Sequence, residues 1–260
     1  MSFGTATAED VPALRCLWMR CFGDTEDYVN LYMQYAFVPE RVFVLREPTL
    51  CAMAISFPVQ YRGEDGTTTD GAYLYAVCIA PEARGRGLFR SLMEQAEQAL
   101  AARGSAFVCL RPASEALLQT YMRMGYQVGF TNRERCIPAV QMGLRLSPLD
   151  PARYGVLRRR ALCGGRVEYP PEVLAHQARL GSLFEARDGD RYGFGAAERW
   201  GETVILKEYL GDETLLPAIG GALGAQRLTV RLPGTEQVFA LAKPLCGQTC
   251  PTGYLAFAFD

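Results

Sequence analysis

Residues 84–90 combine glycine with positive charge in the order RGRGLFR. They follow a nearly continuous apolar run, residues 72–80, and precede residues with the apolar spacing of a helix. At a helix N-terminus the first backbone N–H groups have no partner within the helix, and the helix dipole favours an anion. Gly85 and Gly87 would let the main chain approach a ligand, while the arginines add positive charge. This composition predicts a loop that holds a pyrophosphate group.

Two other phosphate-binding loops fit this segment less well. A P-loop requires Gly-Lys followed by Ser or Thr, and this sequence is absent from residues 84–90. The dinucleotide-binding fingerprint requires a third glycine where Arg90 stands. The remaining alternative is a basic, solvated turn whose glycines serve only the path of the chain.

The elements around this loop predict an α/β fold. Residues 72–80 read as a strand that is buried on both faces, and Leu88, Leu92, Ala96 and Leu100 form the buried stripe of a helix that ends near Gly104. The other elements expected in this half are helices near residues 7–22, 26–35 and 114–125, strands at 41–46, 50–61, 106–110 and 127–135, and a loop at 63–71. A strand, glycine loop, helix and strand in succession form a βαβ-like unit within a mixed sheet.

The second half of the chain repeats this order of elements in a shortened form. Prolines at 148 and 151 indicate a joint, which predicts one domain over residues 1–147 and another over residues 148–260. The elements expected after the joint are helices at 152–162, 171–180 and 215–223, strands at 183–187, 192–198, 203–209 and 227–232, and a last apolar strand at 254–259. The acidic segment Gly211-Asp212-Glu213 stands where the first half has its basic loop.

Composition excludes several classes of protein. The net charge of -1 does not suggest a nucleic-acid-binding surface, and no apolar run reaches the ~20 residues of a membrane span. The N-terminus lacks the basic start and apolar core of a signal peptide, so we expect a cytoplasmic protein. Nine cysteines lie mostly in apolar runs, and the pair Cys246 and Cys250 has no further ligand beside it. The single histidine, His176, makes most catalytic triads improbable, and we expect no metal.

The segment IAPEARGRG, residues 79–87, resembles the signature of the GNAT superfamily of N-acetyltransferases. Phe89 departs from the family, which usually has glycine or alanine there. A bulky residue at this position is similar to the Eis-type branch, whose members carry a degenerate second GNAT-like domain. The resemblance therefore implies tandem GNAT-like domains, each a mixed central sheet flanked by helices. The third, sterol-carrier-like domain of that branch would be missing from a chain that ends at Asp260.

The resemblance also implies acetyl-CoA as the co-substrate and assigns its binding residues. Backbone groups of a short strand segment would pair with the pantetheine arm, and the loop amides would hold the pyrophosphate. The residues concerned are Val77, Cys78, Ile79, Arg84, Gly85, Arg86, Gly87, Leu88, Phe89 and Arg90. The alternative for residues 77–79 is a purely structural strand, which is compatible with backbone contacts to a ligand.

Catalytic roles are implied in the same way. Tyr121 precedes the Gly125-Tyr126 pair by four residues, and in the family this tyrosine protonates the departing CoA thiolate. The alternative is a packing aromatic on a helix. The general base is open between Glu26 with its neighbour Asp27, which are also typical helix-start acids, and the terminal carboxylate of Asp260.

The sequence thus predicts an N-acetyltransferase that transfers acetyl from acetyl-CoA to a primary amine by direct attack. The acceptor would be a small molecule or a peptide, and the second domain would shape the acceptor cleft or the interface of a homo-oligomer. Two alternatives stay open: a non-catalytic acyl-CoA-binding sensor or partner module, and an enzyme with a longer acyl donor or a peptide N-terminus as acceptor.

Overall fold

A computed structural model describes residues 1–200, 203–245, 247 and 249–257. The chain divides into two compact units, and each unit is built from three separate segments of the sequence. Unit 1 contains Met1–Tyr61, Thr68–Gln127 and Leu241–Pro251, and unit 2 contains Arg62–Thr67, Val128–Ala240 and Thr252–Asp260. The fold is of the α/β class, a mixed sheet flanked by helices, as the sequence predicts.

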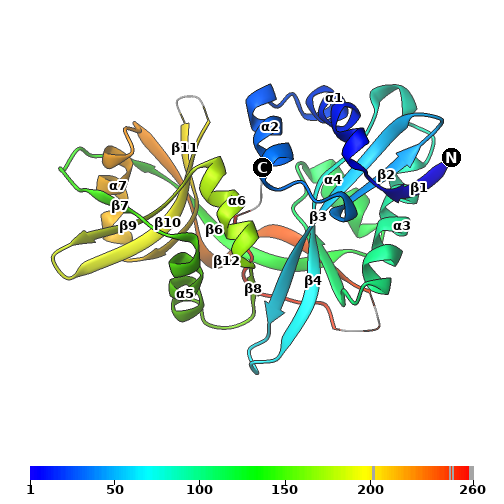
Figure 1. Cartoon of the computed structure of the whole chain (residues 1–260). Helices are drawn as coiled ribbons and strands as arrows, with labels where there is room; N and C mark the ends of the chain where they lie inside the picture. Colours follow the sequence, from blue (N-terminus) through cyan, green and yellow to red (C-terminus); the bar gives the residue numbers. More distant parts are fainter. Residues whose placement is uncertain (201–202, 246, 248, 258–260) are drawn as a thin grey trace. The chain divides into compact units, whose positions relative to one another are not determined.

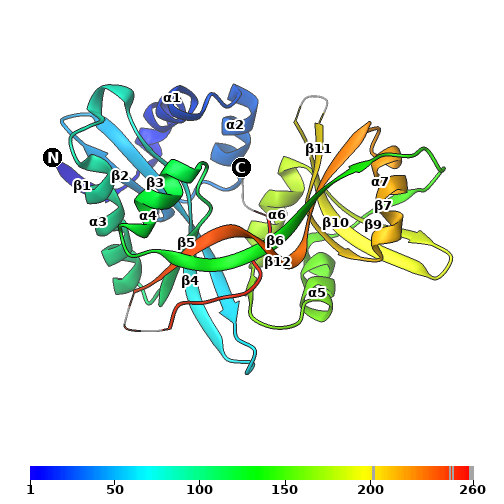
Figure 2. The ribbon, with the colours of Figure 1, turned by 180° about the vertical axis from the view of Figure 1, so that it is seen from behind.

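Unit 1 consists mainly of the elements in the first half of the chain. They are β1 (Ser2–Thr5), α1 (Val11–Phe22), α2 (Glu26–Tyr35), β2 (Val42–Arg46), β3 (Leu50–Arg62), β4 (Thr68–Ile79), α3 (Leu88–Ala102), β5 (Phe107–Leu110) and α4 (Glu115–Met122). The strands are ordered β1-β2-β3-β4-β5. Helices α1 and α3 both contact β4, and the two views show α1 and α2 on one face of these strands and α3 on the other (Figures 1 and 2).

Unit 2 consists mainly of the elements that follow. They are β6 (Gln127–Pro138), β7 (Leu146–Pro148), α5 (Pro151–Ala161), β8 (Arg166–Glu168), α6 (Pro171–Leu180), β9 (Ser182–Asp188), β10 (Arg191–Trp200), β11 (Thr203–Gly211), α7 (Leu216–Ala222) and β12 (Arg227–Pro244). Its strands are ordered β12-β11-β10-β9-β7. Leu206, Ile219 and Leu228 belong to a fully buried cluster that joins α7 to the strands of this unit.

The helices bury the faces that their apolar spacing predicts. Leu14, Leu17 and Trp18 are the buried residues of α1. Leu92 and Leu100 lie on the buried face of α3, which ends beside Gly104 at a φ of 92°. Left-handed backbone of this kind is the usual conformation of a glycine that closes a helix.

The last strand, β12, is much longer than the predicted segment 227–232. Within unit 2, Leu228–Val230 pair in parallel with Val204–Leu206 of β11. Within unit 1, Leu241–Pro244 pair antiparallel with Phe107–Leu110 of β5. Pro233 and Gly234 do not end the strand, because successive parts of it have different hydrogen-bonding partners.

Two further expectations about strands are wrong. The predicted loop at residues 63–71 is confined to residues 63–67, because β4 begins at Thr68 and the polar Asp70 lies within it. The predicted strand at 254–259 is absent from residues 254–257, where Tyr254 forms only an isolated bridge. Ala256 and Phe257 have left-handed φ values of 48° and 51°, which interrupt an extended chain.

Candidate functional site

Strands β4 and β5 run in parallel for only a short distance. Gly71–Tyr73 of β4 lie opposite Phe107–Cys109 of β5, and β5 ends at Leu110 while β4 continues to Ile79. Ala76 interrupts the regular strand with a φ of 48°, which is unusual for a residue with a side chain. Residues 77–79 therefore follow a backbone irregularity and lie beyond the register that β4 shares with β5.

The glycine loop leads from the end of β4 into α3. Gly85 and Gly87 both have a φ of 76°, and Gly87 is the N-cap residue of the helix. A Cβ atom placed on either glycine would meet no atom within 4 Å, so the space beside the main chain is open. Both glycines are thus required by their backbone conformation, and a ligand can approach them closely.

The three arginines of the loop have different partners. Arg84 turns back and donates from Nε to the carbonyl oxygen of Ile79 at 3.2 Å. Arg86 pairs with Glu47 at 2.7 Å, and Arg90 pairs with a carboxylate one turn along α3 at 3.4 Å. The Arg86 and Arg90 pairs are solvent-exposed, and pairs of that kind contribute little to stability.

A cavity of about 440 Å³ lies between the end of β4 and the start of α3. Its lining residues are Cys21, Phe22, Val77, Cys78, Ile79, Ala83, Arg84, Gly85, Gly87, Leu88, Phe89 and Leu117. The structure therefore brings together the predicted cofactor-binding residues except Arg86 and Arg90. Cys21, Phe22 and Leu117 were not anticipated from the sequence, because they reach the cavity from α1 and α4 through tertiary packing.

Tyr121 lies beside this cavity on α4. Its ring packs against Phe89, which lines the cavity, at 5.5 Å between centroids, and against Tyr126 at 5.4 Å. Burial raises the pKa of the Tyr121 hydroxyl well above its ordinary value, so the group is protonated at neutral pH. A phenol in this state can donate a proton and is a poor base.

A buried polar network supports the aromatic pair. The Tyr126 hydroxyl donates to Glu97 of α3 at 2.8 Å, and Lys243 of β12 donates to the same carboxylate at 2.6 Å. All three residues belong to unit 1. The network fixes the ring of Tyr126 and, through it, the packing surface of Tyr121.

The predicted base Glu26 lies elsewhere in unit 1. It is in the first turn of α2, pairs with Arg15 at 2.5 Å, and has a side chain 66% exposed. Neither Glu26 nor Asp27 lines the cavity. Their assignment as the base stays a prediction.

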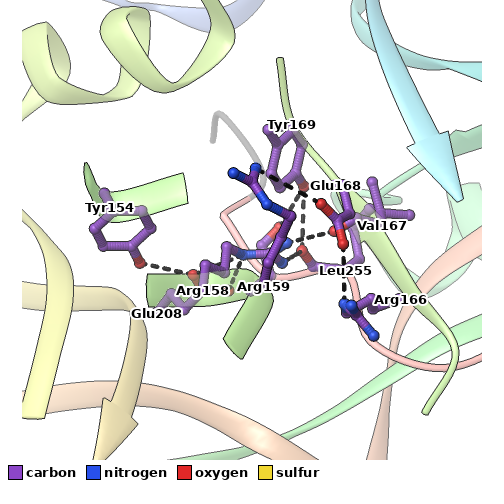
Figure 3. Close-up of polar contacts among 10 residues, drawn as sticks. Tyr154, Arg158, Arg159, Arg166, Val167, Glu168, Tyr169, Glu208 and Leu255 are labelled. Carbon is purple, nitrogen blue, oxygen red and sulfur yellow. Dashed lines mark hydrogen bonds and ion pairs between the residues drawn. The ribbon is translucent and has the colours of Figure 1, made fainter. Parts of the chain in front are cut away.

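The other predicted base, Asp260, lies outside the described residues, but Leu255, five residues before it, is held by contacts within unit 2. Figure 3 shows Arg158 at the centre of these contacts. Its Nη2 donates to the carbonyl oxygen of Leu255 at 3.0 Å, and the Tyr169 hydroxyl donates to the same oxygen at 3.2 Å. Arg158 Nε donates to Glu208 at 2.9 Å, and the Tyr154 hydroxyl donates to Glu208 at 2.6 Å.

The described part of the chain has neither a cluster of metal-ligating residues nor a membrane-spanning helix. No group of three or more His, Cys, Asp or Glu residues there could hold a metal ion. Within the same residues, no helix is long and apolar enough to cross a membrane.

The first half of the chain matches a known protein family. Residues 3–129 match a family model described as an acetyltransferase (GNAT) domain. The matched region contains β4, the glycine loop, α3 and Tyr121. No curated protein matches the chain.

Solved structures resemble almost the whole chain in fold. Eis1 from Mycobacterium abscessus has a TM-score of 0.66 and 13% identity, over 95% of this chain and 74% of its own. A putative acetyltransferase from Pyrococcus horikoshii has a TM-score of 0.63 and 12% identity, over 99% and 95%. Saccharomyces cerevisiae N-myristoyltransferase with bound myristoyl-CoA has a TM-score of 0.61 and 10% identity, over 94% and 83%. At these identities the likeness is one of fold alone.

Proposed function

Since residues 3–129 belong to the GNAT acetyltransferase family and the protein is an acetyltransferase, we propose that it transfers acetyl from acetyl-CoA directly to a primary amine. The observation that carries the proposal is the cavity at the end of β4. One wall is the strand segment 77–79, which lies beyond the β5 register, and another is the glycine loop at the start of α3. The combination suits a ligand with an amide-rich arm and a pyrophosphate.

Each part of the cavity has a role in this proposal. Backbone groups of residues 77–79 pair with the pantetheine arm, since polar main-chain groups require partners. The amides that follow Gly85 and Gly87 bind the pyrophosphate at the helix N-terminus. Phe89 and Leu117 supply apolar surface on the side of α4. This arrangement holds the donor so that its thioester can meet an amine.

Tyr121 is the general acid of the proposed reaction. Attack of an amine on the thioester releases a thiolate, which requires a proton, and the Tyr121 hydroxyl is protonated at neutral pH. The ring lies against Phe89 at the cavity wall, so the hydroxyl is positioned by packing with an aromatic side chain of the donor site. The ammonium form of the acceptor must also lose a proton, for which Glu26 and Asp260 stay candidates.

Donor binding is tested first, by thermal denaturation with acetyl-CoA. A ligand at a hundred times its Kd stabilises the native state by about 2.7 kcal/mol, so the melting temperature of the wild type should rise. Gly87→Glu places a carboxylate at the proposed pyrophosphate site and should remove the shift. Gly104→Glu is the matched control, because Gly104 closes the same helix with a positive φ and equally open space around its Cβ position. Equal shifts in all three proteins would contradict the proposed site.

Catalysis is tested separately with Tyr121→Phe. General acid catalysis contributes roughly 10²- to 10⁴-fold, so kcat should fall by about that factor while the Kd for acetyl-CoA is retained. Tyr126→Phe is the control, because it removes the neighbouring phenol hydroxyl and its bond to Glu97 but keeps both the ring that packs against Tyr121 and the Tyr121 hydroxyl. Unchanged kcat in Tyr121→Phe would exclude Tyr121 as the acid. Binding without turnover against a panel of amines would favour an acyl-CoA sensor.

A further inference from the structure

Two cysteines from separate elements meet on the wall of the cavity. Cys21 is in the last turn of α1, and Cys78 is near the end of β4. Both side chains line the cavity, and the two thiols interact closely enough for each to shift the pKa of the other. The Cys21 Sγ also lies 3.5 Å from the carbonyl oxygen of Ile79. Cys21 is partly exposed, while Cys78 is buried.

The surroundings of the pair favour a thiolate at Cys21. A hydrogen bond from Cys78 and the positive charges of Arg84 and Arg20 lower the pKa of Cys21 to about 6. Arg20 is itself paired with Glu82 at 2.7 Å. The hydrogen bond to Cys21 together with burial raises the pKa of Cys78, which therefore stays a thiol. A reactive thiolate that solvent can reach through the cavity thus has a protonated thiol beside it.

The other described cysteines lack this combination. Cys51 and Cys109 are buried, Cys250 is partly buried, and burial raises the pKa of all three thiols. Cys16, Cys136 and Cys163 are exposed and do not line the cavity. Selective oxidation by a peroxide is therefore expected at Cys21, since susceptibility follows thiolate character and access.

We propose that Cys21 and Cys78 form a peroxide-sensitive dithiol whose disulfide closes the cavity to acyl-CoA. The dithiol is independent of the enzyme's reaction, but the identity of the excluded ligand rests on the proposed function. The Cys21 thiolate attacks hydrogen peroxide, an S–O bond forms, the O–O bond breaks, and hydroxide leaves. The Cys78 sulfur then displaces the hydroxyl from the Cys21 sulfenic acid, an S–S bond forms, and the hydroxyl leaves with the thiol proton as water. The peroxide is reduced and the two thiols are oxidised.

The disulfide acts on the residues that line the donor site. A bond of about 2.05 Å between the sulfurs is shorter than any contact between thiols, so the two cysteine side chains must move toward each other at the cavity wall. The strand segment 77–79 lines the cavity, and so does Phe22, the neighbour of Cys21. Arg84 also loses the negative charge that it faces in the reduced protein. A narrowed cavity and a displaced Arg84 both weaken donor binding.

The first experiment measures disulfide formation without any CoA. Hydrogen peroxide is added to reduced protein in which Cys16, Cys136 and Cys163 are replaced by serine, and the digest is analysed by mass spectrometry. A peptide that links Cys21 to Cys78 should form, should be lost on treatment with dithiothreitol, and should be absent in Cys21→Ser and in Cys78→Ser. Oxidation of Cys21 to the sulfinic acid with Cys78 still free would overturn the dithiol.

A second measurement follows alkylation of Cys21 by iodoacetamide against pH. The rate should reach half its maximum near pH 6, whereas alkylation of a cysteine in a short unstructured peptide reaches it at pH ~8.5. At pH 7 the Cys21 thiol would be about 30-fold richer in thiolate than a thiol with a pKa of ~8.5. Because a thiolate of low pKa is less nucleophilic, the alkylation rate of Cys21 should exceed that of such a thiol only a few-fold. A half-maximum at or above pH 8 would refute the thiolate at Cys21.

The last experiment measures acetyl-CoA binding by the reduced, oxidised and re-reduced protein. The disulfide should weaken binding at least tenfold, and dithiothreitol should restore it. Equal affinity of reduced and oxidised protein would overturn closure of the cavity. The reduced protein could instead form the disulfide with peroxide but fail to bind acetyl-CoA. That result would refute acyl-CoA as the ligand and with it the proposed function, but it would leave the dithiol intact.

Discussion

Replacing Arg158 with alanine removes the cation at the centre of the buried network in unit 2 (Figure 3). The Arg158 side chain is 3% exposed and that of Glu208 is 0% exposed. The alanine variant leaves Glu208 with the Tyr154 hydroxyl as its neutral donor. It also removes the guanidinium donors to the carbonyl oxygens of Val167 and Leu255, although the Leu255 oxygen keeps the Tyr169 hydroxyl as a donor.

The cost follows from the burial of the charge that is left behind. Removal of one partner of a buried ion pair typically costs about 3–5 kcal/mol, because the other charge stays desolvated and uncompensated. A whole domain is usually stable by only about 5–15 kcal/mol. Arg158→Ala should therefore consume a large fraction of the stability of unit 2.

Urea unfolding followed by tryptophan fluorescence measures this effect in unit 2. The chain has two tryptophans, Trp18 in unit 1 and Trp200 in unit 2, so a Trp18→Phe background isolates the signal of unit 2. Arg153→Ala is the control, because Arg153 lies on the same helix in an exposed pair with Glu185 and should cost about 0–1 kcal/mol.

Two results would refute the reasoning about Arg158. The first is a loss in Arg158→Ala no larger than that of the Arg153→Ala control. The second concerns the double variant Arg158→Met with Glu208→Leu, which removes both charges and should recover part of the lost stability. A double variant as unstable as the sum of the two single variants would show that the charges do not interact.

Three further predictions concern other parts of the chain. Gly85→Ala should destabilise unit 1 by about 1 kcal/mol in thermal denaturation, because its φ of 76° is left-handed. Burial lowers the pKa of His176 from 6.5 to about 4, so the free energy of unfolding should fall as the pH drops through this range, and in His176→Gln urea titrations should show a smaller fall. Lys243→Met leaves Glu97 without its cation and should cost about 2 kcal/mol in urea unfolding.

Elements whose signals are local were predictable from the sequence. The stripe of Leu88, Leu92 and Leu100 is the buried face of α3. Ser114 caps α4 by accepting from the backbone N–H of Leu117 at 3.3 Å. Such signals lie within one or two turns of chain, and spacing and capping chemistry are sufficient to interpret them.

Contacts between distant segments were not predictable in the same way. The predicted strand 227–232 stops just before Pro233 and Gly234, and proline cannot donate to a ladder. The strand nevertheless continues to Pro244, since its later residues pair with β5. Nothing within residues 233–244 identifies that partner.

One part of the candidate site was likewise predictable from local sequence, and another part was not. The loop that contains Gly85 and Gly87 was identifiable because glycine and arginine at a helix start have a direct chemical meaning. Cys21, by contrast, is one residue of an amphipathic helix, and only the packing of α1 against β4 places its sulfur near Ile79. The sequence shows that residue 21 is a cysteine, but it contains no signal for the contact that the side chain makes in the folded protein.

The support of Tyr121 shows why the donor site cannot be understood from the matched family region alone. Tyr121 packs on Tyr126, which is held by Glu97, and Glu97 is paired with Lys243. Lys243 lies in the final strand, far beyond residue 129, where the family match ends. Residues 241–244 also cover the edge of β5 that faces away from β4. A chain that stops before β12 would expose that edge and leave the Glu97 carboxylate without its cation, so the proposed acid depends on a strand made near the end of the chain.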